Sequence, residues 1–387
     1  MTAVNYWYTM IYSCFFVFQL QKSGYMLANI RKWGCEYTGG KLMRALFLEG
    51  PRTLSIRETQ IPEIAADEAL IKVHSVGICG SDIEYFSHNR CGSFVPLAPL
   101  VLGHELSGEV VKTGTEVNNI AIGTRVAIDP SMPCRMCRFC RAGRHNLCEN
   151  LRFIGTAATV PHLSGGFGEY VAIRGSNCIM IPENVSWSEA ACLEPLSVAV
   201  HAVLRPRRIA GERVLITGGG AIGQFIALTC RFYGAAVIAM SDIQDFRRIF
   251  AVEQGADFGL NPADSDDIAT VSEEIGGFDL IIDASGAGPA VKQNFHLINK
   301  GGTIVQVGTL SDDLELPFNI VMTKELTILG SFRYGDVYQK AMSMLASEQV
   351  DVKPLISAVF PFDNAVDAFN LASERGNAIK IQVTLNQ

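Results

Sequence analysis

Residues 213–242 read RVLITGGGAIGQFIALTCRFYGAAVIAMSD, and this stretch decides the fold. A short apolar run comes first, and Gly218, Gly220 and Gly223 follow it at the G-x-G-x-x-G spacing. Helix-forming residues come next, and a second apolar run ends at Asp242. Strands of parallel sheets are buried on both faces and read as continuous apolar runs. The order therefore predicts a strand, a tight turn, a helix and a second strand.

The small and acidic residues of this unit are suited to binding a dinucleotide. Gly218 permits the tight turn, Gly220 lets the backbone approach a pyrophosphate, and Gly223 allows close packing of helix on strand. The helix N-terminus faces the anion, and Asp242 is placed to accept both hydroxyls of an adenosine ribose. Three glycines also suit a plain loop, but the flanking strand and helix and the terminal acid argue against that interpretation. The predicted cofactor contacts are Gly218, Gly220, Ala221, Ile222, Gly223, Asp242, Arg247, Val307 and Gly308.

The pattern on either side of this unit divides the chain. From residue 244 to residue 329, predicted helices alternate with short apolar strands, which indicates a doubly wound parallel sheet of six strands. Upstream, the sequence is rich in β-forming residues, with Gly and Pro residues between the predicted strands. The predicted parts are an extension at 1–42, a β-rich domain at 43–191, a nucleotide-binding domain at 192–331, and a tail at 332–387 that returns to the β-rich domain.

The first 42 residues differ from the rest. Residues 6–20 read YWYTMIYSCFFVFQL, which is aromatic and apolar. This run lacks the basic region and the cleavage site of a signal peptide, and it is too short for an ordinary membrane span. We interpret the segment as an upstream extension of a folded domain that begins near Met43. A membrane-surface or partner-binding segment is the alternative.

Composition narrows the function further. The 387 residues carry a formal net charge of −7 and contain no basic run, which disfavours a nucleic-acid partner. Eleven cysteines are present, and four of them fall within fifteen residues. This clustering favours a metal site over a disulfide framework. A thiolate metal site indicates a reducing compartment, and we expect the protein to be cytoplasmic.

The clustered cysteines form the pattern C-x2-C-x2-C-x7-C, in Cys134, Cys137, Cys140 and Cys148. Four thiolates at such short spacings can close a tetrahedral site, which predicts a structural zinc ion. An iron–sulfur cluster is the main rival, because it is also held by clustered cysteines. Arginines between the predicted ligands offset thiolate charge; they are Arg135, Arg138, Arg141 and Arg144. They are also typical of nucleic-acid zinc modules, but the acidic balance of the chain argues against that function.

A second set of metal-binding residue types is spread along the chain. Cys79 lies in GICGSD, His104 and Glu105 lie in VLGHE, and Glu194 lies in CLEPLSVAVHA. One thiolate, one imidazole and one carboxylate from distant segments suit a catalytic zinc with a position left open for water or substrate. Each residue alone also has an ordinary interpretation, as an inert thiol, a core histidine or a surface glutamate.

These motifs carry a family resemblance. In order, GICGSD, VLGHE, PCRMCRFCRAGRHNLC, LEPLSVAVHA and ITGGGAIG resemble the zinc-dependent medium-chain alcohol and polyol dehydrogenases, from about Met43 to the C-terminus. The resemblance implies an α/β fold, a GroES-like β-rich catalytic domain with a Rossmann domain inserted before its last segment. Glu194 favours the polyol branch. Within it, NLRFIGTAATVPHLSGGF and LGSFRYG are most similar to L-idonate 5-dehydrogenases, and sorbitol dehydrogenases are close behind.

The resemblance also implies a reaction and its cofactors. We expect oxidation of a secondary alcohol with hydride transfer to NAD, two zinc ions per chain, and a homo-oligomer, either a dimer or a tetramer. Asp242 favours NAD over NADP, because a carboxylate repels a 2′-phosphate. L-Idonate, giving 5-dehydrogluconate, is the preferred substrate, and sorbitol or xylitol is the alternative. A non-catalytic nucleotide-binding protein of this fold should have lost its metal ligands, and this chain keeps them.

Individual roles follow from the same resemblance. Cys79, His104 and Glu194 are expected to hold the catalytic zinc, with Glu105 beside it as a replacement ligand. Asp82 is expected to orient His104. Ser81 takes the hydroxyl proton, and Glu84 stands where many relatives carry a relay histidine. The expected substrate contacts are Tyr85, Arg152, Phe153 and Arg333. An arginine can grip the carboxylate of a sugar acid with two charge-assisted hydrogen bonds.

Overall fold

The stretch that decides the fold forms the unit that its pattern predicts. In the computed structural model, which describes residues 41–310, 313–374 and 376–385, β11 (Arg213–Thr217) leads into α6 (Ala221–Phe232) and then into β12 (Val237–Ser241). Gly218 has a φ of +97°, in the left-handed region that glycine tolerates. A Cβ atom on Gly223 would lie 1.8 Å from the Gly218 carbonyl oxygen. Only glycine therefore lets α6 begin this close to β11.

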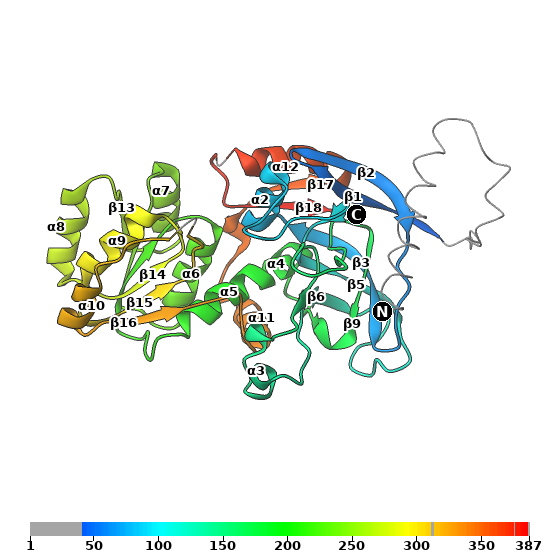
Figure 1. Cartoon of the computed structure of the whole chain (residues 1–387), viewed down its shortest axis with the longest axis horizontal. Helices are drawn as coiled ribbons and strands as arrows, with labels where there is room; N and C mark the ends of the chain where they lie inside the picture. The colour runs from blue at the N-terminus through cyan, green and yellow to red at the C-terminus, as the bar shows by residue number, and fades with distance from the viewer. Residues whose placement is uncertain (1–40, 311–312, 375, 386–387) are drawn as a thin grey trace, which may run out of the picture. The chain divides into compact units, whose positions relative to one another are not determined.

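Around this unit, the described residues form a parallel sheet of six strands, in the order β13-β12-β11-β14-β15-β16 (Figure 1). The prediction of a doubly wound sheet is confirmed. The strand order reverses between β11 and β14, and ligands of such sheets bind beyond the carboxyl ends of the strands at that point. The other strands are β13 (Phe258–Leu260), β14 (Phe278–Asp283), β15 (Ile298–Gln306) and β16 (Thr327–Gly330). The helices between them are α7 (Asp245–Glu253), α8 (Ser265–Ile275), α9 (Gly288–Leu297) and α10 (Phe318–Lys324).

A second, largely antiparallel sheet forms the β-rich part of the described chain. Its order is β10-β6-β5-β3-β18-β17, with β9 paired to β3. The strands are β3 (Glu68–Gly77), β5 (Glu105–Thr113), β6 (Arg125–Ile128), β9 (Tyr170–Arg174), β10 (Cys178–Met180), β17 (Ile356–Pro361) and β18 (Lys380–Thr384). Because β18 pairs with β3, the C-terminal strand lies next to an N-terminal strand of the same sheet.

Several short elements complete the structure and have no clear signal in the sequence. β2 (Thr53–Gln60) lacks the strict alternation of a half-buried strand, and β4 (Leu100–Val101), β7 (Ser131–Met132) and β8 (Arg152–Phe153) are too short for any period to be read.

β1 (Leu42–Gly50) lies between β2 and β4, and β7 pairs with β8. The remaining helices are α2 (Gly80–His88), α3 (Arg138–Arg141), α4 (Trp187–Ala191), α5 (Leu193–Val203), α11 (Tyr338–Ala346) and α12 (Ala365–Ser373).

Apolar side chains from both sheets and their helices form the core. One buried cluster joins α5, α6 and α11 to one face of the parallel sheet, and a second fills the β-rich part. A third covers the other face of the parallel sheet. Among the described residues, every helix is too short or too polar to cross a membrane. The predictions made for residues 1–40 lie outside the part of the chain that the structure describes.

Candidate active site

Three predicted metal ligands meet where β3 ends and β5 begins. Cys79 directly precedes α2 and follows the end of β3, while His104 and Glu105 stand at the start of β5. These strands pair antiparallel, with Gly77 opposite Glu105, so the end of one strand meets the beginning of the other. The ligand atoms of Cys79, His104 and Glu105 all lie within 4.8 Å of one another. This thiol–imidazole–carboxylate cluster is called the active-site cluster below.

Glu194 lies on a different element and outside that 4.8 Å group. It occupies the first turn of α5, where it is buried. Burial raises the pKa of Glu194 to about 8, and the charges of Glu105 and Cys79 act in the same direction. Glu194 therefore lies close enough to the active-site cluster for its charges to act on the Glu194 carboxyl. The carboxylate within 4.8 Å of the Cys79 and His104 ligand atoms, however, is that of Glu105. The expectation of Glu194 as a direct zinc ligand stays a prediction.

Lys380 is a functional residue that sequence reasoning missed. Its ammonium nitrogen lies 2.8 Å from both carboxylate oxygens of Glu105 and 3.1 Å from the carbonyl oxygen of Ile78. Lys380 is only 3% exposed. Burial alone would lower the pKa of Lys380, but the charges of Glu105 and Cys79 and the hydrogen bonds to Glu105 together outweigh burial and raise the pKa. The one sequence signal is a lysine at the start of β18, directly before the apolar Ile381, where a buried charge has to find a partner.

The charges around the active-site cluster fit a divalent cation. Burial raises the pKa of the Cys79 thiol to about 12, and the Glu105 charge adds to the effect. Burial likewise raises the pKa of Asp82. Cys79, Asp82, Glu105 and Glu194 thus bring four acidic groups to one buried region, where the described cations are the Lys380 ammonium and, further out, the Arg333 guanidinium. A zinc ion would balance this excess, and thiolate, imidazole and carboxylate are the donors that zinc prefers.

His104 is placed for an outer contact that would orient a metal ligand. Its Nδ1 atom lies 3.7 Å from the Asp82 carboxylate, and within the described residues neither atom of this pair has a hydrogen-bond partner. The other Asp82 oxygen accepts a hydrogen bond from the Cys79 backbone N–H at 3.0 Å. A carboxylate beside the second ring nitrogen is the usual device for fixing a ligating histidine. The expected role of Asp82 stays a prediction that this geometry supports.

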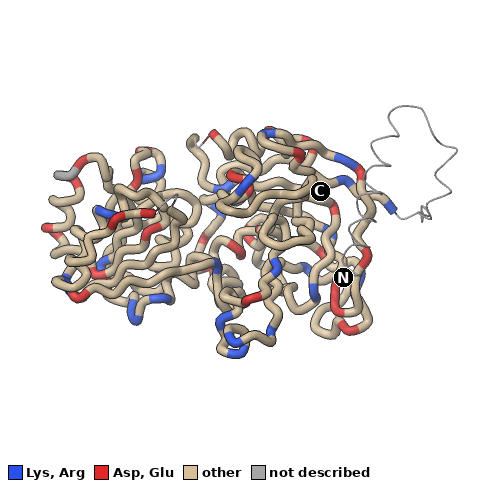
Figure 2. Tube along the Cα trace, in the orientation of Figure 1, with Lys and Arg blue, Asp and Glu red and all other residues tan. Residues whose placement is uncertain are grey.

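The four clustered cysteines also come together. The sulfur atoms of Cys134, Cys137, Cys140 and Cys148 all lie within 4.8 Å of one another. Backbone N–H groups point at two of the sulfurs: Cys134 N lies 3.2 Å from Cys148 Sγ, and Cys137 N lies 3.4 Å from Cys134 Sγ. Backbone N–H groups of Cys140 and Glu149 lower the pKa of Cys137 to about 6. Burial and the neighbouring cysteines raise the pKa of Cys140 to about 12. A bound zinc ion would stabilise the thiolate form of all four cysteines. Figure 2 shows basic residues gathered over the same lobe, around α3.

Arg333 and Phe153 extend the site away from the active-site cluster. The Phe153 ring lies edge-on to His104, with ring centroids 5.6 Å apart. The Arg333 guanidinium carbon lies 4.1 Å from the centroid of the same ring. Burial lowers the pKa of Arg333, and Glu194 and Tyr85 are among the groups whose charge acts on it. Among the described residues, no carboxylate forms an ion pair with Arg333. Tyr85 is buried nearby, and its hydroxyl accepts a hydrogen bond from Ala157 N at 3.1 Å.

Arg152 does not join this group. It is exposed and lines a separate cavity that also contains Met132 and Leu163. Neighbouring side chains of a strand point to opposite faces. Because Phe153 of β8 faces His104, Arg152 points away from the active-site cluster. The structure does not bring Arg152 to the active-site cluster, and its contact with the substrate stays a prediction.

Two predicted catalytic residues lie on α2. The Ser81 side chain hydrogen-bonds the Cys79 thiol. Glu84 is half-exposed, and its carboxylate lies 3.3 Å from His88 Nδ1, one helical turn further on. The residues Ser81, Glu84 and His88 follow at intervals of three and four, so they share one face of the helix. The structure therefore places an acid–imidazole pair on this face of α2, and its part in proton transfer stays a prediction.

The predicted cofactor contacts lie at the carboxyl ends of the parallel strands. Gly220, Ala221, Ile222 and Gly223 stand at the junction of β11 with α6. Asp242 directly follows β12, and its carboxylate accepts hydrogen bonds from Gly219 N and Gln244 N, each at 2.8 Å. Arg247 Nη1 lies 3.5 Å from the same carboxylate. Val307 and Gly308 follow β15, and their N–H groups both donate to the Asp283 carbonyl oxygen at 2.9 Å.

A parallel sheet of dinucleotide-binding order, a cysteine quartet and a buried thiol–imidazole–carboxylate cluster define the class of zinc-dependent nucleotide-linked oxidoreductases. Comparison with known proteins agrees with this. The alcohol dehydrogenase GroES-like domain matches residues 65–183, and the zinc-binding dehydrogenase domain matches residues 221–347.

Individual relatives narrow the class. The chain is 40% identical over 330 residues to the probable D-xylulose reductase A of Aspergillus clavatus, covering 83% of this chain and 91% of that protein. It is 38% identical over 343 residues to sorbitol dehydrogenase of Bos taurus, covering 88% and 95%. The crystal structure of L-idonate 5-dehydrogenase from Escherichia coli is similar with a TM-score of 0.84 at 33% identity, covering 89% of this chain and 98% of that one. The chain therefore belongs to the zinc-dependent medium-chain alcohol and polyol dehydrogenases and acts on a CH–OH group.

Proposed function

We propose that the protein oxidises a secondary alcohol of a sugar acid, with L-idonate converted to 5-dehydrogluconate as the preferred reaction. One observation carries the choice of an acidic substrate: Arg333 lies beside the active-site cluster with no ion-pair partner among the described residues. The Phe153 ring contacts both the His104 ring and the Arg333 guanidinium. A desolvated guanidinium favours a carboxylate strongly over a neutral hydroxyl.

The polyol alternative rests on a different observation. The relatives with the highest identities given above are a xylulose reductase and a sorbitol dehydrogenase, whose substrates carry no carboxylate. In that case Arg333 would donate hydrogen bonds to substrate hydroxyls. The same residues would then hold the reacting carbon, and only the far end of the substrate would differ.

The two candidates are separated by comparing kcat/KM for L-idonate and for sorbitol. If the substrate is a sugar acid, intact enzyme prefers L-idonate, and Arg333→Ala lowers kcat/KM for L-idonate about tenfold or more while changing sorbitol far less. Arg152→Ala is the matched control, because Arg152 points away from the cluster, and it should leave both substrates unchanged. A preference of the intact enzyme for sorbitol would replace the sugar-acid proposal by the polyol one.

The chain's own residues bind and orient the reactants. When bound, zinc supplies a Lewis acid at the substrate oxygen and NAD accepts the hydride. Cys79, His104 and a carboxylate from Glu105 or Glu194 would hold that zinc. Phe153 covers the His104 ring and excludes water from one side. These residues fix the substrate carbon so that its hydrogen can leave as hydride.

The hydroxyl proton leaves by a separate route that begins at Ser81. Ser81 hydrogen-bonds the Cys79 thiol, and its hydroxyl would take the proton from the substrate hydroxyl. Glu84 and His88 then form the outer end of the route, because they lie 3.3 Å apart on the same face of α2 and are both accessible to solvent. Proton transfer through positioned side chains contributes about 100-fold to 10,000-fold in typical enzymes.

NAD is the proposed cofactor. The Asp242 carboxylate is held by two backbone N–H groups at the end of β12, where an adenosine ribose would lie. A carboxylate fixed there accepts bonds from a 2′-hydroxyl and repels a 2′-phosphate. The proposal predicts a higher kcat/KM with NAD than with NADP. Asp242→Ala should reduce the ratio of the two kcat/KM values, because the Arg247 guanidinium, no longer paired with the Asp242 carboxylate, can then bind the 2′-phosphate of NADP. Equal or better turnover with NADP would overturn it.

Assembly into a homo-oligomer is supported by the edge of the parallel sheet. β16 pairs only with β15 among the described strands, and Ile328 on it is 40% exposed. Phe318 and Met322 of α10 are 65% and 70% exposed. Exposed apolar groups at an unpaired edge suit pairing with a second copy. Light scattering after size exclusion should give a dimer or tetramer, and Ile328→Lys should reduce it to monomer.

The reduced state of the cysteines supports a cytoplasmic location for the protein. Every cysteine that the structure describes is free of disulfide bonds, and four of them form the quartet. Thiolate sites of this kind persist where glutathione and thioredoxin keep cysteines reduced, which favours the cytoplasm.

A further inference from the structure

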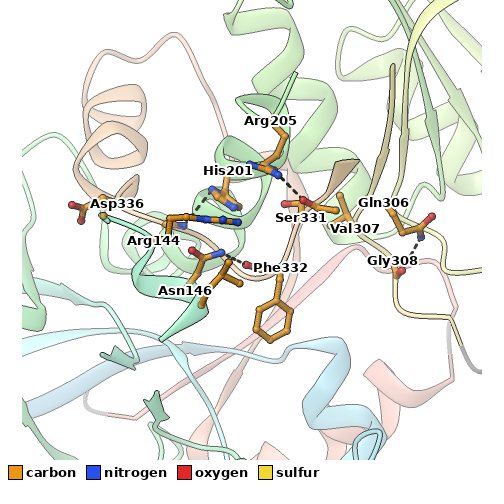
Figure 3. Close-up of a pocket in the computed structure, with 14 residues that line it drawn as sticks. Arg144, Asn146, His201, Arg205, Gln306, Val307, Gly308, Ser331, Phe332 and Asp336 are labelled. Atoms are coloured by element: carbon orange, nitrogen blue, oxygen red, sulfur yellow. Dashed lines mark hydrogen bonds between the residues drawn. The ribbon is translucent and has the colours of Figure 1, made fainter. Parts of the chain in front are cut away.

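A cavity of about 540 Å³ lies beyond the carboxyl ends of β15 and β16 (Figure 3). Its walls come from three places: the loop between the third and fourth cysteines of the quartet, the end of α5 with the residues just after it, and the segments at the ends of β15 and β16. The active-site cluster does not line it. Val307 and Gly308, which we expect at the cofactor, form part of one wall. The cavity is therefore next to the expected cofactor site without being part of the active-site cluster.

Hydrogen-bond donors dominate the polar side chains of the cavity. Arg144 enters from the loop after α3, and Arg205 enters from the end of α5. Arg205 Nε donates to the Gly330 carbonyl oxygen at 2.9 Å, which fixes this guanidinium and leaves its two terminal nitrogens free to turn toward the cavity. Among the described residues, neither arginine forms an ion pair with a carboxylate.

His201 lies between the two arginines and adds a third donor. Figure 3 shows Arg144 and Arg205 on either side of the His201 ring. His201 Nδ1 accepts a hydrogen bond from Gly335 N at 3.3 Å, so the remaining proton of the neutral ring sits on Nε2. Burial, then the charges of Arg205 and Arg144, lower the pKa of His201 to about 4. The imidazole is thus neutral at physiological pH.

One carboxylate also lines the cavity, that of Asp336, and it points toward His145 and away from the arginines. Asp336 is 86% exposed and lies 3.9 Å from His145 Nδ1, and Figure 3 shows its carboxylate pointing away from the two guanidinium groups. Two guanidinium groups and one imidazole therefore line a cavity whose own carboxylate does not neutralise them. Arg205 is half-buried and Arg144 is exposed, and guanidinium groups bind oxyanions with charge-assisted hydrogen bonds.

We propose that this cavity is a binding site for a small oxyanion, phosphate or carboxylate, held by Arg144 and Arg205 with His201 donating from Nε2. The two arginines come from separate parts of the chain, so a bound anion connects the cysteine lobe to the end of α5. Because the expected cofactor contacts Val307 and Gly308 share the cavity wall, a bound anion changes how tightly the cofactor binds.

The test is calorimetric titration of inorganic phosphate into the zinc-loaded full chain at neutral pH, in a phosphate-free buffer of constant ionic strength. We expect saturable binding at one site per chain. Arg144→Gln and Arg205→Gln should each weaken it about tenfold or more, because each removes charged hydrogen bonds to the anion. Arg205→Lys, which keeps the charge, should weaken it less. Arg207→Gln is the matched control: Arg207 is exposed, lies two residues from Arg205, and does not line the cavity.

Zinc content and melting temperature in phosphate-free buffer show that each variant is folded. Absence of saturable phosphate binding by intact protein would overturn the proposal. So would equal losses in Arg205→Gln and Arg207→Gln, since that would reflect general surface charge.

A second measurement identifies the source of the oxyanion, and this part rests on the proposed function. If the carboxylate of the substrate occupies the cavity, phosphate competes with L-idonate, and Arg205→Gln raises KM for L-idonate but not for sorbitol. If a free anion occupies it, phosphate changes the Kd of NADH in the absence of any substrate, and Arg205→Gln abolishes that change. Failure of the sugar-acid proposal leaves the phosphate titration intact, so the two inferences fail separately.

Discussion

At the scale of single residues, the active site depends on a contact between Glu105 and Lys380. The ammonium of Lys380 lies between both carboxylate oxygens of Glu105, and both side chains are almost fully buried. Gly77 makes room for this pair, since a Cβ atom there would lie 2.1 Å from the nearer Glu105 oxygen. Lys380 neutralises one of four acidic groups in the region, which limits the charge that a metal ion has to balance.

Replacing Lys380 by methionine tests this role. We expect Lys380→Met to lower the free energy of unfolding of zinc-free protein by about 3 kcal/mol or more, because a buried carboxylate loses its partner. The loss should be smaller in zinc-loaded protein, since zinc can replace the missing charge. Urea unfolding with and without a chelator measures both values.

Two variants serve as controls for that comparison. Lys380→Arg keeps the charge and should recover most of the stability. Lys353→Met removes a lysine that is 66% exposed and should change little. Equal losses with and without zinc in Lys380→Met would show that the lysine acts on the fold alone.

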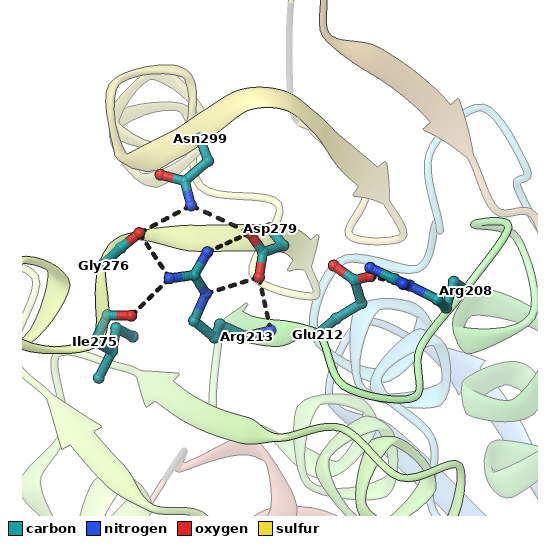
Figure 4. A network of polar contacts seen from close by, with 7 residues as sticks. All are labelled: Arg208, Glu212, Arg213, Ile275, Gly276, Asp279 and Asn299. Carbon is teal, nitrogen blue, oxygen red and sulfur yellow. Dashed lines mark hydrogen bonds and ion pairs between the residues drawn. The ribbon is translucent and has the colours of Figure 1, made fainter.

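At the scale of elements, an ion pair joins neighbouring strands of the parallel sheet. Arg213 at the start of β11 binds Asp279 of β14 through two side-chain contacts of 2.7 Å, and its other nitrogen donates to the carbonyl oxygens of Ile275 and Gly276 (Figure 4). Asn299 completes the network from β15. The contacts fix the amino ends of β11, β14 and β15, opposite the end that binds ligands.

This network predicts a pH-dependent contribution to stability. The hydrogen bond from Arg213 lowers the pKa of Asp279. The stabilisation is therefore present above the unfolded-state pKa, about 4, and is lost as the pH falls through the lower folded-state value. Asp279→Asn should reduce the free energy of unfolding by about 1 kcal/mol at neutral pH, the range for a partly exposed charged pair. The difference from intact protein should shrink as the pH falls below about 4. A difference that does not change with pH would point to a packing effect.

The cysteine lobe around α3 is a second element-scale unit. We expect Cys134→Ser to lose one zinc ion and to lower the melting temperature, because structural zinc contributes folding free energy. Cys79→Ser should lose or weaken binding of the other zinc and abolish turnover, while circular dichroism shows an intact fold. Metal analysis and thermal unfolding of both variants distinguish the two sites. Iron in the intact protein, or a single zinc ion, would contradict the expectation of two zinc sites with different roles.

At the scale of the whole molecule, the metal and nucleotide motifs all lie after Met43. Deleting residues 1–42 should therefore leave kcat/KM unchanged within experimental error, as measured with the preferred substrate and NAD. The shortened chain should also keep the zinc content and the oligomeric state of the full one. A soluble but inactive product would show that the segment is part of the working enzyme.

Local spacing in the sequence determined the parallel sheet, the glycine turn and the cysteine quartet. The residues that build each of these lie within a few turns or strands of one another, so periodicity and spacing report on them directly. The resemblance then supplied the distant ligands Cys79 and His104, which the structure brings together.

Only the tertiary structure decided the contacts between distant segments. Lys380 and Glu105 are 275 residues apart, and no local pattern connects them. The pairing of β7 with β8 turns Phe153 toward His104 and Arg152 away from it, a choice that two strand residues cannot reveal by themselves. Arg144 and Arg205 share a cavity for the same reason. Chain topology sets such contacts, because antiparallel and crossover connections bring together residues whose spacing in the sequence carries no information.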